Sequence, residues 1–206
     1  MGEILIGRLK LKGDLTILNR AKGLIVFAHG SGSSRKSPRN NFVAKKLQEK
    51  RLATLLFDLL TEEEDKIYSN RFNIPLLTER LIYASYFVKQ HKILKKLKVC
   101  YFGSSTGAAA ALKAAYHFQD GIRAVVSRGG RVDLADDILN QIKVPTLFIV
   151  GDKDSDVLRL NRLAFHKLKC EKKLKILEGA SHLFVEPGKI EQVAELAGNW
   201  FEEHLN

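Results

Sequence analysis

The sequence predicts an α/β protein whose core is a mostly parallel sheet of about eight strands, with helices on both faces. Three observations predict this fold class. Short apolar runs alternate with helical patterns along most of the 206 residues, which is typical of a parallel sheet covered by helices. The runs are continuously apolar, as in strands buried on both faces. No repeat, linker or change of composition interrupts the chain, so we expect a single domain over residues 1–206.

The elements follow in a simple order. An N-terminal hairpin is expected at 4–11 and 15–18, because Gly13-Asp14 supplies a turn between two alternating runs. Buried strands are predicted at 24–28, 53–57, 99–102, 124–126 and 146–150, with a last strand at 174–177. Helical patterns lie at 40–50, 74–90, 105–118, 134–141, 155–168 and 190–204. The long connections 30–41 and 59–73 are candidates for functional loops.

The net charge of +11 and the pI near 9.6 do not by themselves indicate a partner. The lysines and arginines are interleaved with Leu, Ile and Val at spacings that suit helix faces and strand ends, so we interpret them as solvated surface. A nucleic-acid site would need interleaved aromatic residues or a known binding motif, and neither is present. The sequence therefore predicts no nucleic-acid partner.

Cysteine usage and hydropathy indicate the compartment. Only Cys100 and Cys170 occur, which gives neither a disulfide framework nor a paired metal-ligand spacing. The N-terminus has no basic region leading into an apolar stretch, and no segment reaches the roughly 18 apolar residues of a membrane span. We expect a soluble, cytoplasmic protein with no metal site and no membrane partner.

A candidate nucleophile follows one of the predicted strands. The strand at 99–102 runs into Gly103-Ser104-Ser105-Thr106-Gly107 and then into an Ala-rich helix, which is a G-x-S-x-G turn in a strand–turn–helix context. Glycine on both sides lets the two backbones approach, and the helix N-terminus favours negative charge that develops on a substrate. A nucleotide-binding turn is disfavoured, because the P-loop lysine is missing and G-x-G-x-x-G is not matched. Ser105 is the predicted nucleophile.

A serine nucleophile needs a base and an orienting carboxylate, and both follow in the chain. His182, just beyond the last predicted strand, is the candidate base. Asp154, just beyond the strand at 146–150, is the candidate acid. Other carboxylates near these strand ends keep the choice of acid open: Asp152, Asp156, Asp133, Asp136 and Asp137.

A tetrahedral intermediate also needs two backbone N–H donors for its oxyanion. Thr106, the residue after the nucleophile, is expected to supply one of them. Ser31, in the Gly-rich loop after the strand at 24–28, is expected to supply the other. His29 at the start of this loop is expected to hold the loop rather than to take part in the reaction.

The segments that carry these residues resemble the α/β-hydrolase superfamily in sequence and in order: Ala28-His29-Gly30-Ser31-Gly32, Gly103-Ser104-Ser105-Thr106-Gly107, Gly151-Asp152-Lys153-Asp154 and Gly179-Ala180-Ser181-His182. More narrowly, the chain is similar over nearly its whole length to small lidless members grouped with dienelactone hydrolases. Those enzymes have cysteine where this chain has Ser105, so their substrate is not carried over. The resemblance implies hydrolysis of a carboxylic ester or related acyl compound through an acyl-enzyme, with no metal or organic cofactor.

Three classes of function remain open. The first is a serine esterase, the second a thioesterase, amidase or acyltransferase with the same triad, and the third a non-catalytic binding protein. The intact set of Ser105, Asp154 and His182 weighs against the third. Many superfamily members insert a cap after the sixth strand, but the connection 127–144 is short, so we expect no large cap and a small, soluble substrate. The protein is expected to be a monomer or a homodimer.

Arginines are expected near the mouth of the site. Arg128 and Arg131 follow a strand end, and Arg39 or Arg35 lies in or near the long connection 30–41. Arginine suits carboxylate and phosphate geometry, so we hypothesise that one or more of them binds an anionic group of the substrate. The alternative is local pairing with Asp133, Asp136 or Asp137.

Overall fold

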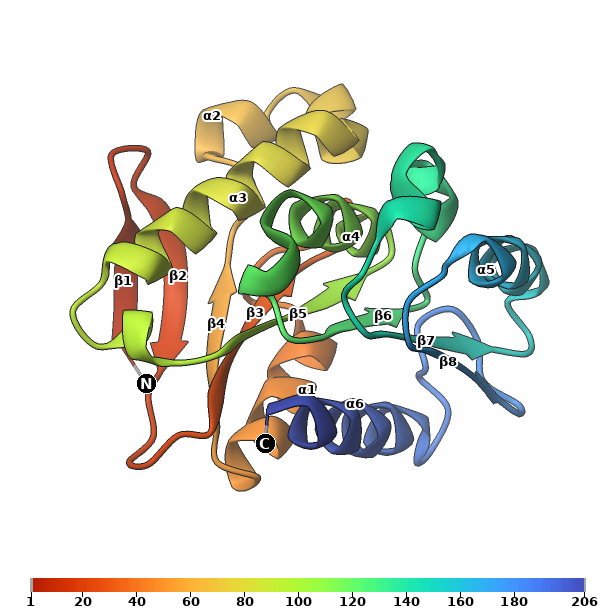
Figure 1. The fold of residues 1–206 in the computed structure, drawn as a ribbon. Helices are drawn as coiled ribbons and strands as arrows, with labels where there is room; N and C mark the ends of the chain where they lie inside the picture. Colours follow the sequence, from red (N-terminus) through yellow and green to blue (C-terminus); the bar gives the residue numbers. More distant parts are fainter. Residues whose placement is uncertain (1, 206) are drawn as a thin grey trace.

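The computed structural model describes residues 2–205, which contain one eight-stranded sheet (Figure 1). The strand order is β1-β2-β4-β3-β5-β6-β7-β8. β2 is antiparallel to both of its neighbours, β1 and β4, and every pair from β4 through β8 is parallel. The predicted mostly parallel sheet of about eight strands is therefore confirmed.

Strands and helices alternate along most of the described chain. The strands are β1 (Gly2–Ile6), β2 (Leu11–Thr16), β3 (Gly23–Ala28), β4 (Leu52–Phe57), β5 (Val99–Ser104), β6 (Val125–Arg128), β7 (Thr146–Gly151) and β8 (Lys172–Leu177). The α-helices are α1 (Pro38–Glu49), α2 (Glu62–Asp65), α3 (Ile74–Gln90), α4 (Thr106–Phe118), α5 (Ser155–Lys167) and α6 (Lys189–Leu205). Segments of 3₁₀ helix are η1 (Tyr68–Phe72), η2 (Leu94–Lys96), η3 (Gln119–Gly121) and η4 (Val132–Gln141).

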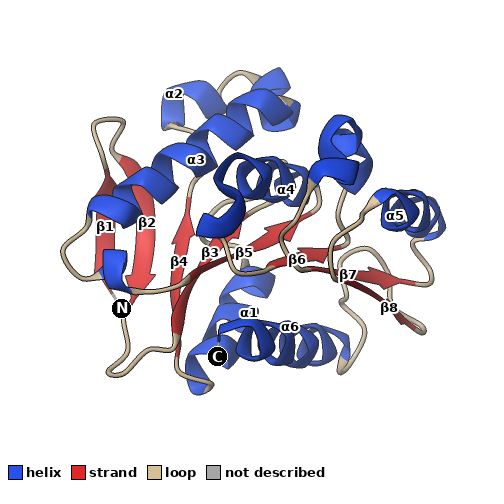
Figure 2. Ribbon diagram, viewed as in Figure 1, coloured by secondary structure: helices blue, strands red, loops and turns tan. Residues whose placement is uncertain are grey.

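Helices cover both faces of the sheet (Figure 2). α1 and α6 lie side by side on one face, and α3, α4 and α5 lie on the other. Each face has its own cluster of buried apolar side chains. Most of the buried residues of α4 are alanine, so its backbone lies close to the elements packed around it, which include β5, β6 and β3. This close packing fixes the start of α4 at the end of β5.

The N-terminal hairpin has a different turn from the predicted one. The turn lies at residues 7–10, and Gly13-Asp14 is part of β2, so the predicted turn was wrong. Gly7 has a φ of 56° and a Cβ there would lie 2.2 Å from the hydroxyl oxygen of Tyr83, so glycine is needed at this turn. Asp14 is buried in β2, where an ion pair with Lys36 at 2.8 Å offsets the loss of hydration.

The other predicted elements lie where expected, with ends that differ by a few residues. α3 matches the range 74–90, and the side chain of Asn73 caps it by accepting from the N–H of Leu76 at 3.1 Å. The pattern at 134–141 lies within η4, which is 3₁₀ rather than α, and Ala135 interrupts its backbone with φ −113° and ψ 20°. The connection from β6 to β7 therefore carries η4 and no large cap.

The long connection 59–73 is more regular than a loop. It contains α2 and η1, which the sequence patterns did not predict. The side chain of Thr61 accepts from the N–H of Glu64, and Glu64 accepts from the N–H of Thr61, so α2 begins with a capping box. Within residues 2–205, no helix combines the length and the apolar character needed to cross a membrane.

Candidate active site

Ser105 lies on a strained turn between β5 and α4. Its φ is 50° and its ψ is −122°, a backbone conformation that is uncommon for a residue with a side chain. A Cβ on Gly103 would lie 2.5 Å from Cα of Ala108. A Cβ on Gly107 would lie 2.2 Å from the carbonyl oxygen of Ala28. Both glycines are therefore needed for the close approach of strand and helix that such a nucleophile turn requires.

A short hydrogen bond joins His182 and Asp154. Nδ1 of His182 lies 2.5 Å from Oδ2 of Asp154. The Asp154 side chain is 14% exposed and that of His182 is 38% exposed, so the carboxylate is shielded while the imidazole stays accessible. When the carboxylate accepts the Nδ1–H, Nε2 is the nitrogen left to accept a proton. The pair therefore has the arrangement of an orienting acid and a base.

Ser105 and His182 both lie close to the backbone of Arg128 and Gly129. The N–H of Ser105 donates to the carbonyl oxygen of Arg128 at 3.2 Å. A Cβ on Gly129 would lie 3.2 Å from the carbonyl oxygen of His182 and 3.4 Å from its Nδ1, so His182 lies against this part of the backbone. The hydrogen bonds recorded among residues 2–205 do not include one between Oγ of Ser105 and His182. The structure thus brings the serine and the histidine to one place without joining them.

The competing carboxylates have other partners or surroundings. Asp133, Asp136 and Asp137 form ion pairs with Arg131, Lys167 and Lys113 respectively. Asp156 is exposed in the first turn of α5, and the buried Oδ1 of Asp152 has no hydrogen-bond partner among the described residues. Of these carboxylates, Asp154 is the one that contacts His182.

The two expected oxyanion donors lie beside the nucleophile. A Cβ on Gly30 would lie 3.0 Å from Cβ of Ser105, which places the loop after β3 directly against the turn. The N–H of Ser31 donates to Oγ1 of Thr106 at 2.9 Å, so in this structure it is engaged by a side chain. Thr106 is the first residue of α4, where a helix leaves backbone N–H groups without an intrahelical partner.

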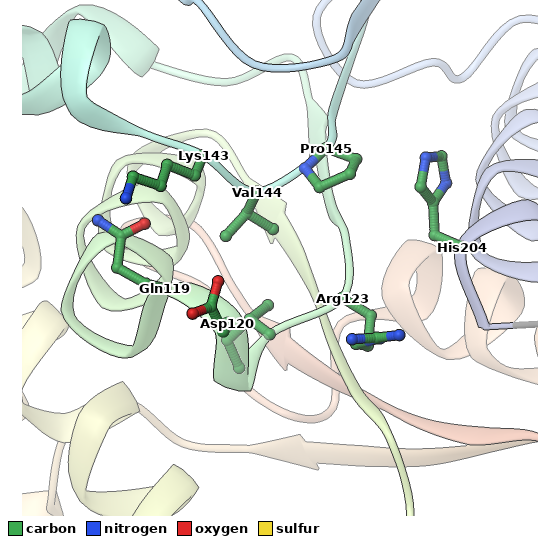
Figure 3. Close-up of a pocket in the computed structure, with 8 residues that line it drawn as sticks. Gln119, Asp120, Arg123, Lys143, Val144, Pro145 and His204 are labelled. Carbon is green, nitrogen blue, oxygen red and sulfur yellow. The ribbon is translucent and has the colours of Figure 1, made fainter.

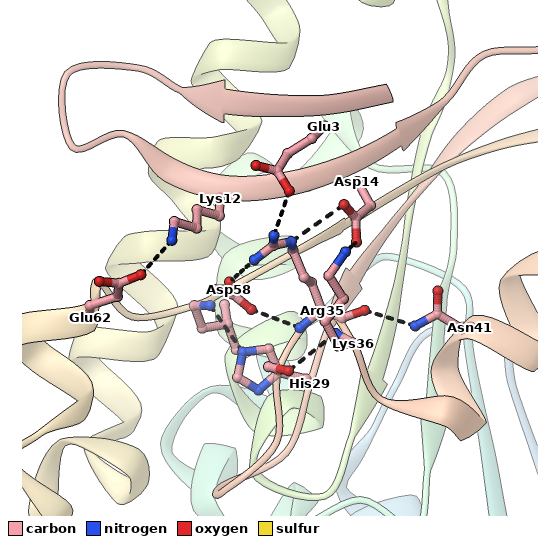
Figure 4. Close-up of polar contacts among 11 residues, drawn as sticks. Glu3, Lys12, Asp14, His29, Arg35, Lys36, Asn41, Asp58 and Glu62 are labelled. Atoms are coloured by element: carbon pink, nitrogen blue, oxygen red, sulfur yellow. Dashed lines mark hydrogen bonds and ion pairs between the residues drawn. The ribbon is translucent and has the colours of Figure 1, made fainter. Parts of the chain in front are cut away.

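His29 holds the loop that carries Ser31 (Figure 4). Its side chain is buried, with Nδ1 2.9 Å from the carbonyl oxygen of Gly30. Its Nε2 accepts from the N–H of Leu59 at 3.0 Å. Both ring nitrogens of the neutral imidazole are therefore used in joining this loop to the connection after β4, which agrees with the predicted structural role.

Arg35 anchors the same loop through ion pairs (Figure 4). Its guanidinium contacts carboxylates of three strands or strand ends, Glu3 at 2.8 Å, Asp14 at 3.4 Å and Asp58 at 2.7 Å. The Arg35 side chain is only 11% exposed, so these contacts compensate a largely buried charge. Arg35 therefore fixes the loop to the sheet.

The unfolding free energy is expected to decrease as the pH falls from about 7.5 to about 5.5, in part through His29. Burial lowers the pKa of His29 from its ordinary value of 6.5, because the charged ring would lose hydration. The unfolded chain then binds a proton at a higher pH than the folded chain, so this stability is present above the unfolded pKa and is lost below it.

Urea unfolding of wild type and His29→Asn at the two pH values measures this contribution. Asparagine keeps a polar side chain of similar shape near the backbone but does not titrate in this pH range. The loss of stability at the lower pH should be smaller in His29→Asn. An equal loss in both proteins would contradict the role of His29, because every other titrating group is common to them.

The three arginines predicted to bind substrate have different surroundings. Arg131 donates to Asp133 through Nε at 2.9 Å and Nη2 at 2.8 Å, so for this residue the local-pairing alternative is observed. Arg128 and Arg39 have no ion pair among residues 2–205, and each has at least one buried guanidinium nitrogen without a partner. Burial lowers the pKa of Arg128 to about 10, and the positive charge of Arg39 contributes.

Two cavities differ in their relation to this site. One of about 160 Å³ adjoins the loop after β3 and the connection 59–73; its walls are His29, Ser33, Ser34, Asp58, Leu60, Thr61, Glu62 and Asp65. The other, of about 240 Å³, contains Gln119, Arg123 and Lys143 in its wall (Figure 3). These residues follow α4 or precede β6 and β7, so this cavity lies at the opposite edge of the sheet from Ser105.

A family model described as an alpha/beta hydrolase domain matches residues 21–198. The chain belongs to the α/β-hydrolase family. Its structure is similar to the crystal structure of a dienelactone hydrolase from Anabaena variabilis ATCC 29413, with 49% identity, a TM-score of 0.95 and coverage of 100% of this chain and 97% of that one. Est1E from Butyrivibrio proteoclasticus, with 16% identity, a TM-score of 0.82 and coverage of 99% and 98%, shares the fold.

Two curated relatives of this α/β-hydrolase come from Mycobacterium tuberculosis, strains CDC 1551 / Oshkosh and ATCC 25618 / H37Rv. Each is named a "Putative phosphoribosyl transferase" and is 49% identical over 203 residues. The match covers 98% of this chain but only 46% of each relative, so the chain spans about half of their length. The name describes those longer proteins and assigns no activity to the part that matches this chain.

Two contacts in this α/β-hydrolase site are not predicted by the sequence. Thr106 is expected to contribute its N–H, yet its side chain also accepts from the N–H of Ser31. The ring of Phe184, two residues beyond His182, lies 5.8 Å from the guanidinium carbon of Arg128. Phe184 has a φ of 55°, and no local pattern in the sequence marks a positive φ at a phenylalanine.

Proposed function

We propose that this hydrolase cleaves small carboxylic esters through an acyl-enzyme on Ser105. The contact of 2.5 Å between His182 and Asp154, beside the strained turn of Ser105, is the observation that carries the proposal. The 49% identity to a protein described as a dienelactone hydrolase supports ester cleavage, because a lactone is a cyclic ester. The strain at Ser105 supports a role in chemistry, since strained backbone is concentrated at functional sites.

In the proposed reaction, Oγ of Ser105 attacks the ester carbonyl carbon and its proton passes to Nε2 of His182. Asp154 stabilises the imidazolium that forms. The intermediate collapses when the alcohol leaves with the proton from His182. Water then attacks the acyl-enzyme by the same route, which releases the acid and restores Ser105.

The N–H groups of Thr106 and Ser31 stabilise the oxyanion of each intermediate in this proposal. The Ser31 N–H now donates to the hydroxyl of Thr106. An oxyanion is a stronger acceptor than a neutral hydroxyl, so the N–H turns to it or is shared with it as charge develops. The close contact between Gly30 and Ser105 supports this, because the loop is already within reach of the reacting atoms.

A fluorophosphonate probe is expected to label the wild-type protein once, at Ser105, because only an activated serine attacks the probe's phosphorus rapidly. The masses of the intact protein and of the labelled peptide report the label. Ser105→Ala should stay unlabelled. Ser104→Ala is the matched control: its hydroxyl donates to Asn40 at 3.0 Å, and its loss should leave the label in place.

Label on another residue, or none on folded wild-type protein, would reject Ser105 as the nucleophile. Matched oxygen esters, thioesters and anilides of one short acid then separate an esterase from a thioesterase or an amidase. Oxygen esters are expected to give the highest kcat/KM. A higher kcat/KM for thioesters or anilides would be consistent with the triad but would show that the enzyme prefers a bond other than an oxygen ester.

A further inference from the structure

Arg128 lies next to the nucleophile turn on the face of the sheet that carries α1. It is the last residue of β6 and pairs in register with Ser104, so the two side chains are on the same face. Ser104 donates to Asn40 of α1, which identifies that face. Arg128 is only 6% exposed, and the ring of Phe184 lies against its guanidinium. Its Nε and Nη1 are buried without a hydrogen-bond partner.

Arg39 approaches the same place from the first turn of α1. It directly precedes Asn40, whose side chain accepts from Ser104. Its Nε is also buried without a partner. Burial lowers the pKa of Arg128, and the positive charge of Arg39 lowers it further. The first turn of α1 adds partial positive charge from its backbone N–H groups.

Arg128 and Arg39 differ from Arg35 and Arg131 in their lack of a counter-charge. Arg35 and Arg131 each form ion pairs, whereas the ion pairs within residues 2–205 include none to Arg128 or Arg39. Burying a guanidinium without acceptors is unfavourable, and an anion between the two would relieve both the lost hydration and the repulsion. The unmatched donors therefore point to a ligand.

We propose that Arg128 and Arg39 form a binding subsite, next to Ser105, for a carboxylate or phosphate group of the ester substrate. The inference rests on the proposed function, because it names the class of ester that the site takes. Guanidinium groups bind either oxyanion through paired N–H donors. Arg131 is outside the subsite, since Asp133 already uses its donors.

The subsite is tested on the acyl side by comparing kcat/KM for two series of esters. One series is the monomethyl esters of dicarboxylic acids with four to six carbons, and the other is the methyl esters of the matching monocarboxylic acids. The pair 4-acetoxybenzoate and phenyl acetate tests it on the alcohol side. On at least one side, wild type should favour the anionic ester in kcat/KM by about tenfold or more. Arg128→Leu and Arg39→Gln should each lower that ratio by about tenfold. Arg131→Gln, which removes one positive charge from the same loop, should leave the ratio unchanged.

Anion binding to Ser105→Ala, measured by titration calorimetry with succinate and with inorganic phosphate, gives a readout that needs no turnover. Binding that Arg128→Leu or Arg39→Gln weakens in this background supports the subsite, and the better ligand tells carboxylate from phosphate. If Arg128→Leu does not fold, Arg39→Gln and Arg128→Lys carry the test, since lysine keeps the charge but loses the paired donors.

No preference for anionic esters, together with no arginine-dependent anion binding, would overturn the subsite while leaving ester hydrolysis intact. An equal loss on neutral and anionic esters in the arginine variants would also overturn it, because that result describes a structural role. Arginine-dependent anion binding without hydrolysis of any ester would instead support the subsite and reject the proposed function.

Discussion

Ser105→Ala and His182→Ala are each expected to lower kcat for a short ester by about 10⁴-fold or more, and the double variant should lose no more than either single one. The reason is that nucleophile and base act as one unit. A serine without a base is a weak nucleophile, and a base without the serine has no proton to take. Initial rates, measured with the spontaneous hydrolysis subtracted, provide the test.

The same series tests the carboxylate. Asp154→Asn keeps the shape of the side chain but removes the charge that stabilises the imidazolium, so kcat should fall by about 10²-fold to 10⁴-fold. Asp156→Asn is the matched control, since this exposed carboxylate lies two residues further along, in the first turn of α5. The triad would be contradicted if the decreases in kcat of the two single variants multiplied in the Ser105 and His182 double variant. Equal decreases in kcat in Asp154→Asn and Asp156→Asn would also contradict it.

The parts of the fold that the sequence predicts well are those buried on both faces. β3 to β7 each contain a short, mostly apolar run, and the middle of a sheet is the environment that favours such a run. The predicted position of the hairpin turn is wrong because the position of this turn depends on contacts between residues distant in sequence. Gly7 fits against Tyr83, and Lys36 stabilises Asp14 inside a strand. Neither contact leaves a local pattern.

The candidate site follows the same division. Ser105, His182 and Asp154 could be proposed because each follows a buried strand, and parallel strands bring their carboxyl ends to one edge of the sheet. The choice of Asp154 over the other carboxylates rests on a distance that only the structure supplies. The sequence does not distinguish Arg131 from Arg128 as a substrate-binding residue. In the structure Arg131 is paired with Asp133 and Arg128 is not, and this pairing depends on rotamers that the sequence does not encode locally.

Gly107→Ala is expected to lower the unfolding free energy by about 3 kcal/mol or more, although helix propensity alone predicts a gain of up to about 1 kcal/mol. The new Cβ would lie 2.2 Å from the carbonyl oxygen of Ala28 and 2.4 Å from that of His29. Both atoms are backbone at the end of β3, so no side-chain rotation relieves the overlap. The start of α4 must move away from the sheet instead.

Gly179→Ala separates this overlap from ordinary glycine strain. Gly179 has a φ of 71° but no atom near the position of a Cβ, so alanine there should lower stability by about 1 kcal/mol through backbone conformation alone. Urea unfolding monitored by circular dichroism measures both variants. A gain of stability in Gly107→Ala would show that α4 can move freely. The expected loss, with reduced labelling of Ser105 in the folded fraction, would show that the packing of α4 on β3 sets the geometry of the nucleophile turn.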